Sequence, residues 1–160
     1  MAEIFTLDDM ITFVWAFFIT LPIVAVIHSA GHFFFAKIFE GKTNIVLGKG
    51  RSICSFGIFE LRLLYFVDSE SYYQELKIDN RLTHCLVYAG GVIFNGLFII
   101  LVNTAIYYGY LPKHQFFYQF VYFSLYYIFF ALLPIQYGKD HVTDGKAIWN
   151  IIKNGKPTAE

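Results

Sequence analysis

The sequence has few charged residues. Asp, Glu, Lys and Arg together make up 15% of its 160 residues, whereas hydrophobic residues make up 57% and aromatic residues 21%. A water-soluble domain of this length needs more polar surface than this composition supplies. The shortage of charge therefore argues against a soluble protein and favours a single membrane domain over residues 1–160.

Several signatures are also missing. The two cysteines, Cys54 and Cys85, have neither CxxC nor disulfide-framework spacing, so we interpret them as free thiols. The sequence contains no glycine loop of the phosphate-binding type. It also lacks a basic surface interleaved with aromatic residues, which argues against nucleic acid as a partner.

Three long runs without charge are present instead. They cover residues 11–27 with an uncharged continuation to residue 36, residues 82–111 and residues 115–138. About 20 residues of helix cross a bilayer, so the runs predict transmembrane helices over about 10–38, 82–110 and 115–138. The acidic N-terminus and the length of the first run argue against a removable signal peptide.

The basic residues are unevenly distributed. Of the twelve Lys and Arg residues, seven lie between Lys37 and Arg81 and four follow the third run, whereas the connection between the second and third runs contains only Lys113. Loops rich in Lys and Arg stay in the cytoplasm. We therefore expect an integral membrane protein with its N-terminus outside and both the segment 37–81 and the C-terminus in the cytoplasm.

The polar insert, about residues 42–80, reads as strands followed by a helix. Residues 43–67 are rich in β-branched and aromatic residues with glycines between them, which predicts a small sheet at the cytoplasmic membrane face. Ser71 and Gln74 have the spacing of a capping box for a short helix before the second crossing. Beyond the third crossing, isoleucines on one face predict an interfacial tail helix over about 144–154.

Two histidines stand out inside the first apolar run. His28 and His32 are four residues apart, so on a helix they share one face, as in zinc-binding helices. Titratable side chains deep in a membrane helix are costly, and they are either functional or paired inside the bundle. The alternative to a metal site is that both imidazoles hydrogen-bond to other helices.

A catalytic zinc needs a third protein ligand, and two histidines with one carboxylate are a common set. The first helix reaches His28 after about 25 Å of a roughly 30 Å apolar core, near the end at which the third helix emerges. Asp144, followed by Gly145, is therefore the preferred third ligand, with Asp140 and His141 as alternatives. Such a ligand set also binds iron and other metals.

The chain also carries three short motifs in a particular order. They are HSAGH at residues 28–32, AGGVIFNGL at 89–97 and LLPIQYGKDHVTDGKAI at 132–148. In this order they resemble the HExGH, glycine-asparagine and N-x-x-P…D-G segments of the site-2 proteases, which are intramembrane zinc metalloproteases. The resemblance covers nearly the whole chain.

The resemblance implies an all-α membrane protein with the three-helix site-2 protease core and a small cytoplasmic β insert. It implies one zinc ion near the cytoplasmic face, held by His28, His32 and Asp144. It implies substrate-binding residues at Gly91, Asn95 and Pro134. The expected partner in the bilayer is a membrane-inserted peptide or a transmembrane helix of another protein.

Three positions depart from the family pattern. Ser29 stands where the family has its general-base glutamate, Ala131 stands where it has asparagine, and the segment from Pro134 to Asp144 is longer than usual. Serine has no useful basicity near neutrality, and proton transfer to a base is worth roughly 10²–10⁴-fold in rate. We therefore expect hydrolysis to be impaired or absent. The candidates for a substitute base are Glu60, Glu70, Glu75, Asp140 and His141.

Two classes of function remain open from the sequence. The first is a zinc metalloprotease homologue that acts on a membrane-inserted peptide with an unusual or absent base. The second is a non-catalytic membrane regulator, chaperone or transporter-associated subunit that uses the same groove, with or without metal. A carboxylate near the metal would favour the first class.

Overall fold

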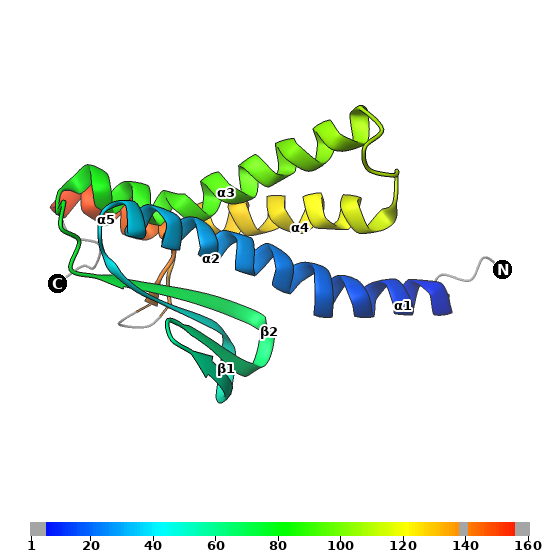
Figure 1. Cartoon of the computed structure of the whole chain (residues 1–160), viewed down its shortest axis with the longest axis horizontal. Helices are drawn as coiled ribbons and strands as arrows, with labels where there is room; N and C mark the ends of the chain where they lie inside the picture. The colour runs from blue at the N-terminus through cyan, green and yellow to red at the C-terminus, as the bar shows by residue number, and fades with distance from the viewer. Residues whose placement is uncertain (1–5, 138–140, 156–160) are drawn as a thin grey trace.

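A computed structural model describes residues 6–137 and 141–155. Three of its helical stretches are long and apolar enough to cross a membrane: Leu7–Ile38, Arg81–Tyr107 and Gln115–Leu132. They lie side by side, and a two-stranded ribbon flanks the first of them (Figure 1). The molecule therefore has the three expected apolar helices and a small sheet.

The first stretch consists of α1 (Leu7–Trp15), a π-helical segment (Ala16–Thr20) and α2 (Leu21–Ile38). Pro22 explains the irregularity, because proline has no N–H to donate to the carbonyl four residues earlier and its ring crowds that carbonyl. The carbonyl in question belongs to Phe18, and it accepts a hydrogen bond from the hydroxyl of Tyr65 at 3.2 Å. Pro22 thus creates an attachment point for the ribbon.

The ribbon consists of the antiparallel strands β1 (Lys42–Phe56) and β2 (Phe59–Gln74). It curls on itself, since residues 45–47 pair with both 69–71 and 59–61. β2 runs beside the first span, with the rings of Phe66 and Phe18 edge to face at 4.7 Å and the Ser69 hydroxyl donating to the carbonyl of Ala25 at 3.5 Å.

The short helix expected after Ser71 does not form, because residues 71–74 belong to β2. The capping box lies further on, where the Asn80 side chain accepts from the backbone N–H of Thr83 and the Thr83 hydroxyl accepts in return from the N–H of Asn80. It opens α3 (Arg81–Tyr107). The true box therefore stands directly at the start of the second span, where the sequence Asn-x-x-Thr supplies both acceptors.

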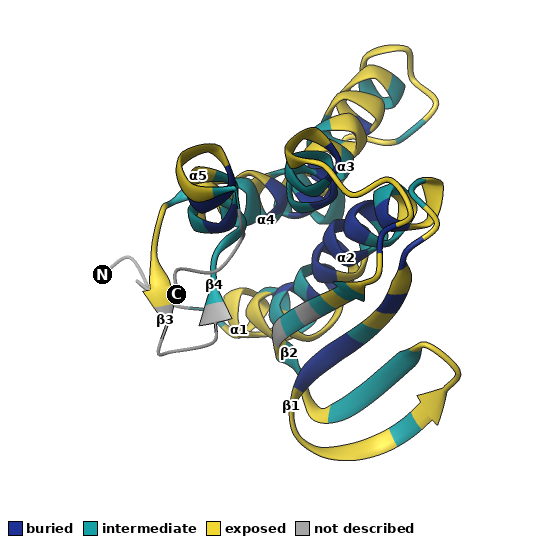
Figure 2. Ribbon diagram, turned by 90° about the vertical axis from the view of Figure 1, so that its left-hand side faces the viewer, coloured by how far each residue is buried: buried dark blue, intermediate teal, exposed yellow. Residues whose placement is uncertain are grey.

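Helices α2 and α3 approach each other closely through two glycines. A Cβ on Gly31 would lie 2.1 Å from the carbonyl oxygen of Gly90, and a Cβ on Gly90 would lie 2.5 Å from that of Gly31. No other residue fits at either position without moving a helix. Figure 2 shows buried residues concentrated on the faces of α2 and α3 that meet.

Helix α4 (Gln115–Leu132) ends at Leu132 rather than near residue 138. The cause is Pro134, which excludes helical backbone from the residue before it, and Leu133 accordingly is extended with ψ 129°. Two short strands follow, β3 (Gln136–Tyr137) and β4 (His141–Val142). The tail helix α5 (Asp144–Asn154) then begins at the expected residue.

Candidate metal centre

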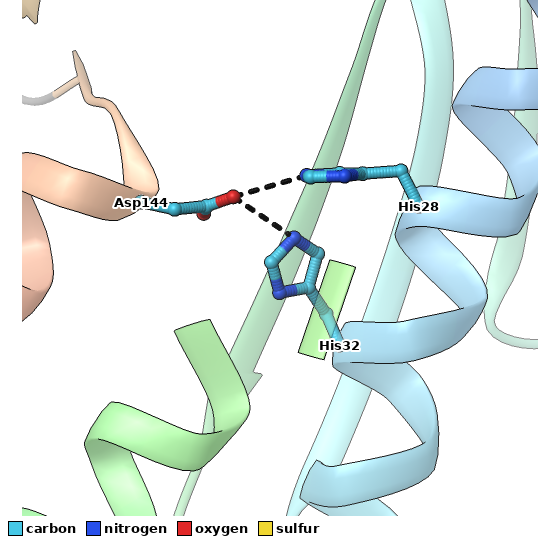
Figure 3. Close-up of side chains that lie close together, drawn as sticks. All are labelled: His28, His32 and Asp144. Carbon is cyan, nitrogen blue, oxygen red and sulfur yellow. Dashed lines mark hydrogen bonds and ion pairs between the residues drawn. The ribbon is translucent and has the colours of Figure 1, made fainter. Parts of the chain in front are cut away.

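His28, His32 and Asp144 come together from two elements far apart in the sequence. Both histidines project from α2, and Asp144, the first residue of α5, reaches between them (Figure 3). The Asp144 Oδ2 atom lies 3.0 Å from His28 Nε2 and 3.5 Å from His32 Nε2. All three potential ligand atoms lie within 4.8 Å of one another.

The cluster is shielded from solvent. His28 is 5% exposed, His32 is 7% exposed, and the side chain of Asp144 is 15% exposed. Burial alone would raise the pKa of Asp144, but the facing imidazoles outweigh it and hold the pKa below its ordinary value. Asp144 is therefore a carboxylate, which is the form that binds metal.

A backbone contact fixes the tautomer of His32. Its Nδ1 lies 2.8 Å from the carbonyl oxygen of Val87, and because a carbonyl only accepts, Nδ1 must carry the proton. In the neutral ring, Nε2 then presents a lone pair to a carboxylate oxygen of Asp144 that also has only lone pairs. Two acceptors in this position require a cation between them, either a second proton on the ring or a metal ion.

Asn95 and Gly91 surround the second imidazole. The amide nitrogen of Asn95 lies 3.4 Å from His28 Nδ1, and the amide oxygen is buried without a partner among the described residues. Turning the isosteric amide presents that oxygen to Nδ1–H, which leaves Nε2 unprotonated toward Asp144. A Cβ on Gly91 would lie 2.5 Å from the His28 ring, so only glycine leaves room for it.

The start of α5 is held in place by two features of its sequence. The hydroxyl of Thr143 donates to the carbonyl of Leu133 and also caps the helix by accepting from the N–H of Lys146. A Cβ on Gly145 would lie 2.1 Å from the carbonyl oxygen of Leu132, so glycine allows α5 to pack against the end of α4. The positive end of the helix dipole also favours the carboxylate of Asp144.

This donor set fits a zinc ion. Ligand atoms at about 2.0–2.1 Å around a tetrahedral ion lie roughly 3.4 Å apart, close to the separations within the cluster. The Val87 carbonyl and the Asn95 amide are the kind of outer contacts that orient metal-binding histidines. His28, His32 and Asp144 would thus hold the ion.

Ser29 does not replace the missing base. It is 2% exposed, and within the part of the chain that the structure describes its hydroxyl has no hydrogen-bond partner. Glu60 is paired with Arg62 at 3.0 Å, and Glu75 is paired with Lys42. The remaining candidate bases, Asp140 and the side chains of Glu70 and His141, lie outside what the structure describes.

The expected substrate residues have different surroundings. Gly91 and Asn95 lie against His28 and support its ring, whereas Pro134 is exposed in the segment that follows α4. Two contacts at the site had no sequence signal: the Val87 carbonyl and Tyr127, whose ring lies 5.0 Å from that of His28. The Tyr127 hydroxyl lies 3.2 Å from that of Ser69 and so links α4 to β2.

The chain has a close relative among known proteins. It is 47% identical over 152 residues to the uncharacterized membrane protein YwmF of Bacillus subtilis (strain 168), an alignment that covers 95% of this chain and 96% of that protein. No family model matches the chain, and no solved structure matches it. The three apolar helices and the similarity to a membrane protein together identify the chain as an integral membrane protein.

Proposed function

The chain belongs to the family of the Bacillus subtilis membrane protein YwmF, and we propose that it is a site-2-protease-like protein that holds one zinc ion in the membrane. The ligands are His28, His32 and Asp144. The protein binds a membrane-inserted peptide or transmembrane helix beside this ion. Its hydrolysis of that partner is impaired or absent.

The observation that carries the proposal is the tautomer of His32. The Val87 carbonyl accepts from Nδ1–H, so in the neutral ring the second nitrogen faces an Asp144 oxygen at 3.5 Å as a bare acceptor. A role of His32 in packing alone would be better served by a donor facing the carboxylate. A divalent cation satisfies both histidines and the carboxylate at once, and it compensates for the buried negative charge.

The remaining chemistry follows from Ser29. A bound zinc ion supplies Lewis acidity, which polarises a peptide carbonyl and activates water. The protein must supply the group that accepts the proton, and a serine hydroxyl is too weak a base for this. The buried surroundings of Ser29 support a protein that binds its partner and hydrolyses it slowly or not at all.

The charge distribution supports an orientation. Four basic residues lie at the end of the bundle that contains the cluster: Lys37, Lys42, Lys77 and Arg81. The opposite connection, between α3 and α4, carries Lys113 alone. By the positive-inside rule, the metal centre lies near the cytoplasmic face, with the N-terminus outside and α5 in the cytoplasm.

Metal analysis of the detergent-purified protein, combined with Ser29 variants, tests the proposal. We expect about one zinc per chain, lost in His28→Ala and in Asp144→Ala. On membrane-inserted peptides, Ser29→Glu should gain cleavage by roughly 10²-fold or more over Ser29→Gln, a control of the same shape without basicity. Equal rates in these two variants would favour the non-catalytic regulator, and absence of zinc would sink both forms of the proposal.

A further inference from the structure

A second histidine and aspartate pair lies near the start of α3. The Nε2 atom of His84 lies 2.6 Å from an Asp79 carboxylate oxygen, and its Nδ1 atom lies 2.9 Å from the hydroxyl of Tyr73 on β2. The side chain of Asp79 is 75% exposed and that of His84 is 20% exposed. One end of this hydrogen-bonded group therefore reaches solvent.

The group continues inward through a second tyrosine. The rings of Tyr73 and Tyr88 lie edge to face at 5.3 Å, and the two side chains interact. Tyr88 is three residues before Gly91 on α3 and shares the helix face that packs against His28. The negative charge of Asp144 also acts on Tyr88. The inner end of the chain from Asp79 to Tyr88 therefore faces the metal centre.

The direction of these hydrogen bonds depends on the protonation of His84. A neutral ring with its proton on Nε2, toward Asp79, accepts at Nδ1, so Tyr73 donates to it and receives a hydrogen bond from Tyr88. A cationic ring donates from both nitrogens, so Tyr73 accepts from His84 and donates to Tyr88. Moving one proton along the chain converts the first arrangement into the second.

A recess connects the same chain to the ligands. It lies between α2 and the ribbon, and its lining includes His32 and Tyr73 together with Thr43 and Ser71. The Thr43 and Ser71 hydroxyls are buried and have no partner among the described residues. Hydroxyls of this kind are the partners that a buried water requires. Tyr73 thus lines the same small recess as His32, a proposed zinc ligand.

We propose that the chain of side chains from Tyr88 to Asp79 is a proton relay between the buried centre and the protein surface. A proton arriving at the Tyr88 oxygen releases the Tyr88 hydrogen to Tyr73, which releases its own to His84 Nδ1. The proton on His84 Nε2 leaves to Asp79 and then to water. No electrons are transferred, and each tyrosine ends neutral. The inference rests on the proposed function, because the buried centre that the relay would connect to the surface is the proposed zinc site.

The surroundings suit a relay of neutral tyrosines. Burial raises the pKa of Tyr73, and the neighbouring Tyr88, Cys85 and Asp79 raise it further, so its hydroxyl keeps its proton. These groups, with Asp79 on the solvent side, are the titratable side chains that face His84 and Tyr73 in the described structure. The charge at the outer end therefore resides on His84 and Asp79.

The relay can be tested by ¹⁵N NMR of histidine-labelled protein in micelles, with the His84 signals assigned from His84→Gln. We expect neutral His84 to carry its proton on Nε2. We also expect its ring ¹⁵N chemical shifts at a fixed pH to differ between the zinc-loaded and zinc-free forms of the wild type. The two sets of shifts should coincide in Tyr73→Phe, which keeps the ring and removes the link. Tyr107→Phe, exposed at the opposite end of α3, is the control and should behave as the wild type.

The outcomes separate the relay from the zinc proposal. An equal zinc-induced difference in Tyr73→Phe would show coupling through space and overturn the relay, as would a His84 proton on Nδ1. If the wild type binds no zinc, the proposed function fails, and Asp144→Asn then serves as the perturbation of the inner end. The relay is overturned if Asp144→Asn changes the His84 ¹⁵N chemical shifts equally with and without Tyr73→Phe, or if it changes them in neither background.

Discussion

The molecule contains two clusters of histidine and aspartate that differ in what lies between the rings and the carboxylate. In the first, His32 donates Nδ1–H to a backbone carbonyl, and in the neutral ring Nε2 faces Asp144 without a proton. In the second, both nitrogens of His84 have a hydrogen-bond partner, and Asp79 is largely in solvent. The same residue types thus form an incomplete site in one place and a complete network in the other.

Burial and one backbone contact explain the difference. A carboxylate in water pairs with a histidine without need of a metal, whereas a buried carboxylate needs full compensation of its charge. The Val87 carbonyl removes the one proton with which neutral His32 could have provided it. This difference is why we propose metal binding for the first cluster and proton transfer for the second.

The largest difference between the two clusters should appear in zinc affinity when the carboxylate of each is removed. Asp144→Asn should weaken zinc binding by about 100-fold or more, because it removes a charged ligand from a buried site. Asp79→Asn should leave the affinity unchanged within about twofold, since Asp79 is exposed. Competition titrations with a zinc-binding dye measure both, and equal losses would erase the distinction between the clusters.

A methyl group added beside His28 should disturb the first cluster alone. Gly91→Ala places a Cβ within 2.5 Å of the imidazole, and we expect roughly 10–100-fold weaker zinc binding. Gly96 lies on the same helix, and a Cβ there would have open space within 4 Å, so Gly96→Ala should bind zinc normally. Wild-type affinity in Gly91→Ala would mean that the orientation of His28 does not matter.

The smallest expected effect is on stability, because the second cluster should contribute little to the free energy of unfolding. Loss of its hydrogen bond in Asp79→Asn should lower the free energy of unfolding by about 1 kcal/mol or less, because the carboxylate is largely solvated. Denaturant titration in mixed micelles measures this change. A loss of several kcal/mol would show that the cluster holds β2 to α3 and is more than a path for protons.

Much of the first cluster can be predicted from the sequence. The spacing of His28 and His32 places them on one helix face, and counting helical rises brings Asp144 to the same depth. Local signals also mark the spans and the start of α5. These features depend on the periodicity and length of the apolar segments, and both can be read from one sequence.

The contacts that distinguish the two clusters could not be predicted from the sequence. A backbone carbonyl such as that of Val87 has no residue signature, and the Tyr73 to His84 contact joins a strand to a helix. The course of β2 beside the first span depends on the Phe18 carbonyl that Pro22 leaves without its usual donor. The end of α4 before Pro134 follows a local rule that the uncharged run to residue 138 obscured.

X-ray absorption at the zinc edge of the purified protein tests the central claim most directly. We predict about one zinc per chain with nitrogen and oxygen neighbours at about 2.0–2.1 Å, including histidine scattering that is lost in His32→Ala. A sulfur shell near about 2.3 Å would place the metal on cysteine instead. That result, or a protein that binds no zinc, would contradict the account of the first cluster.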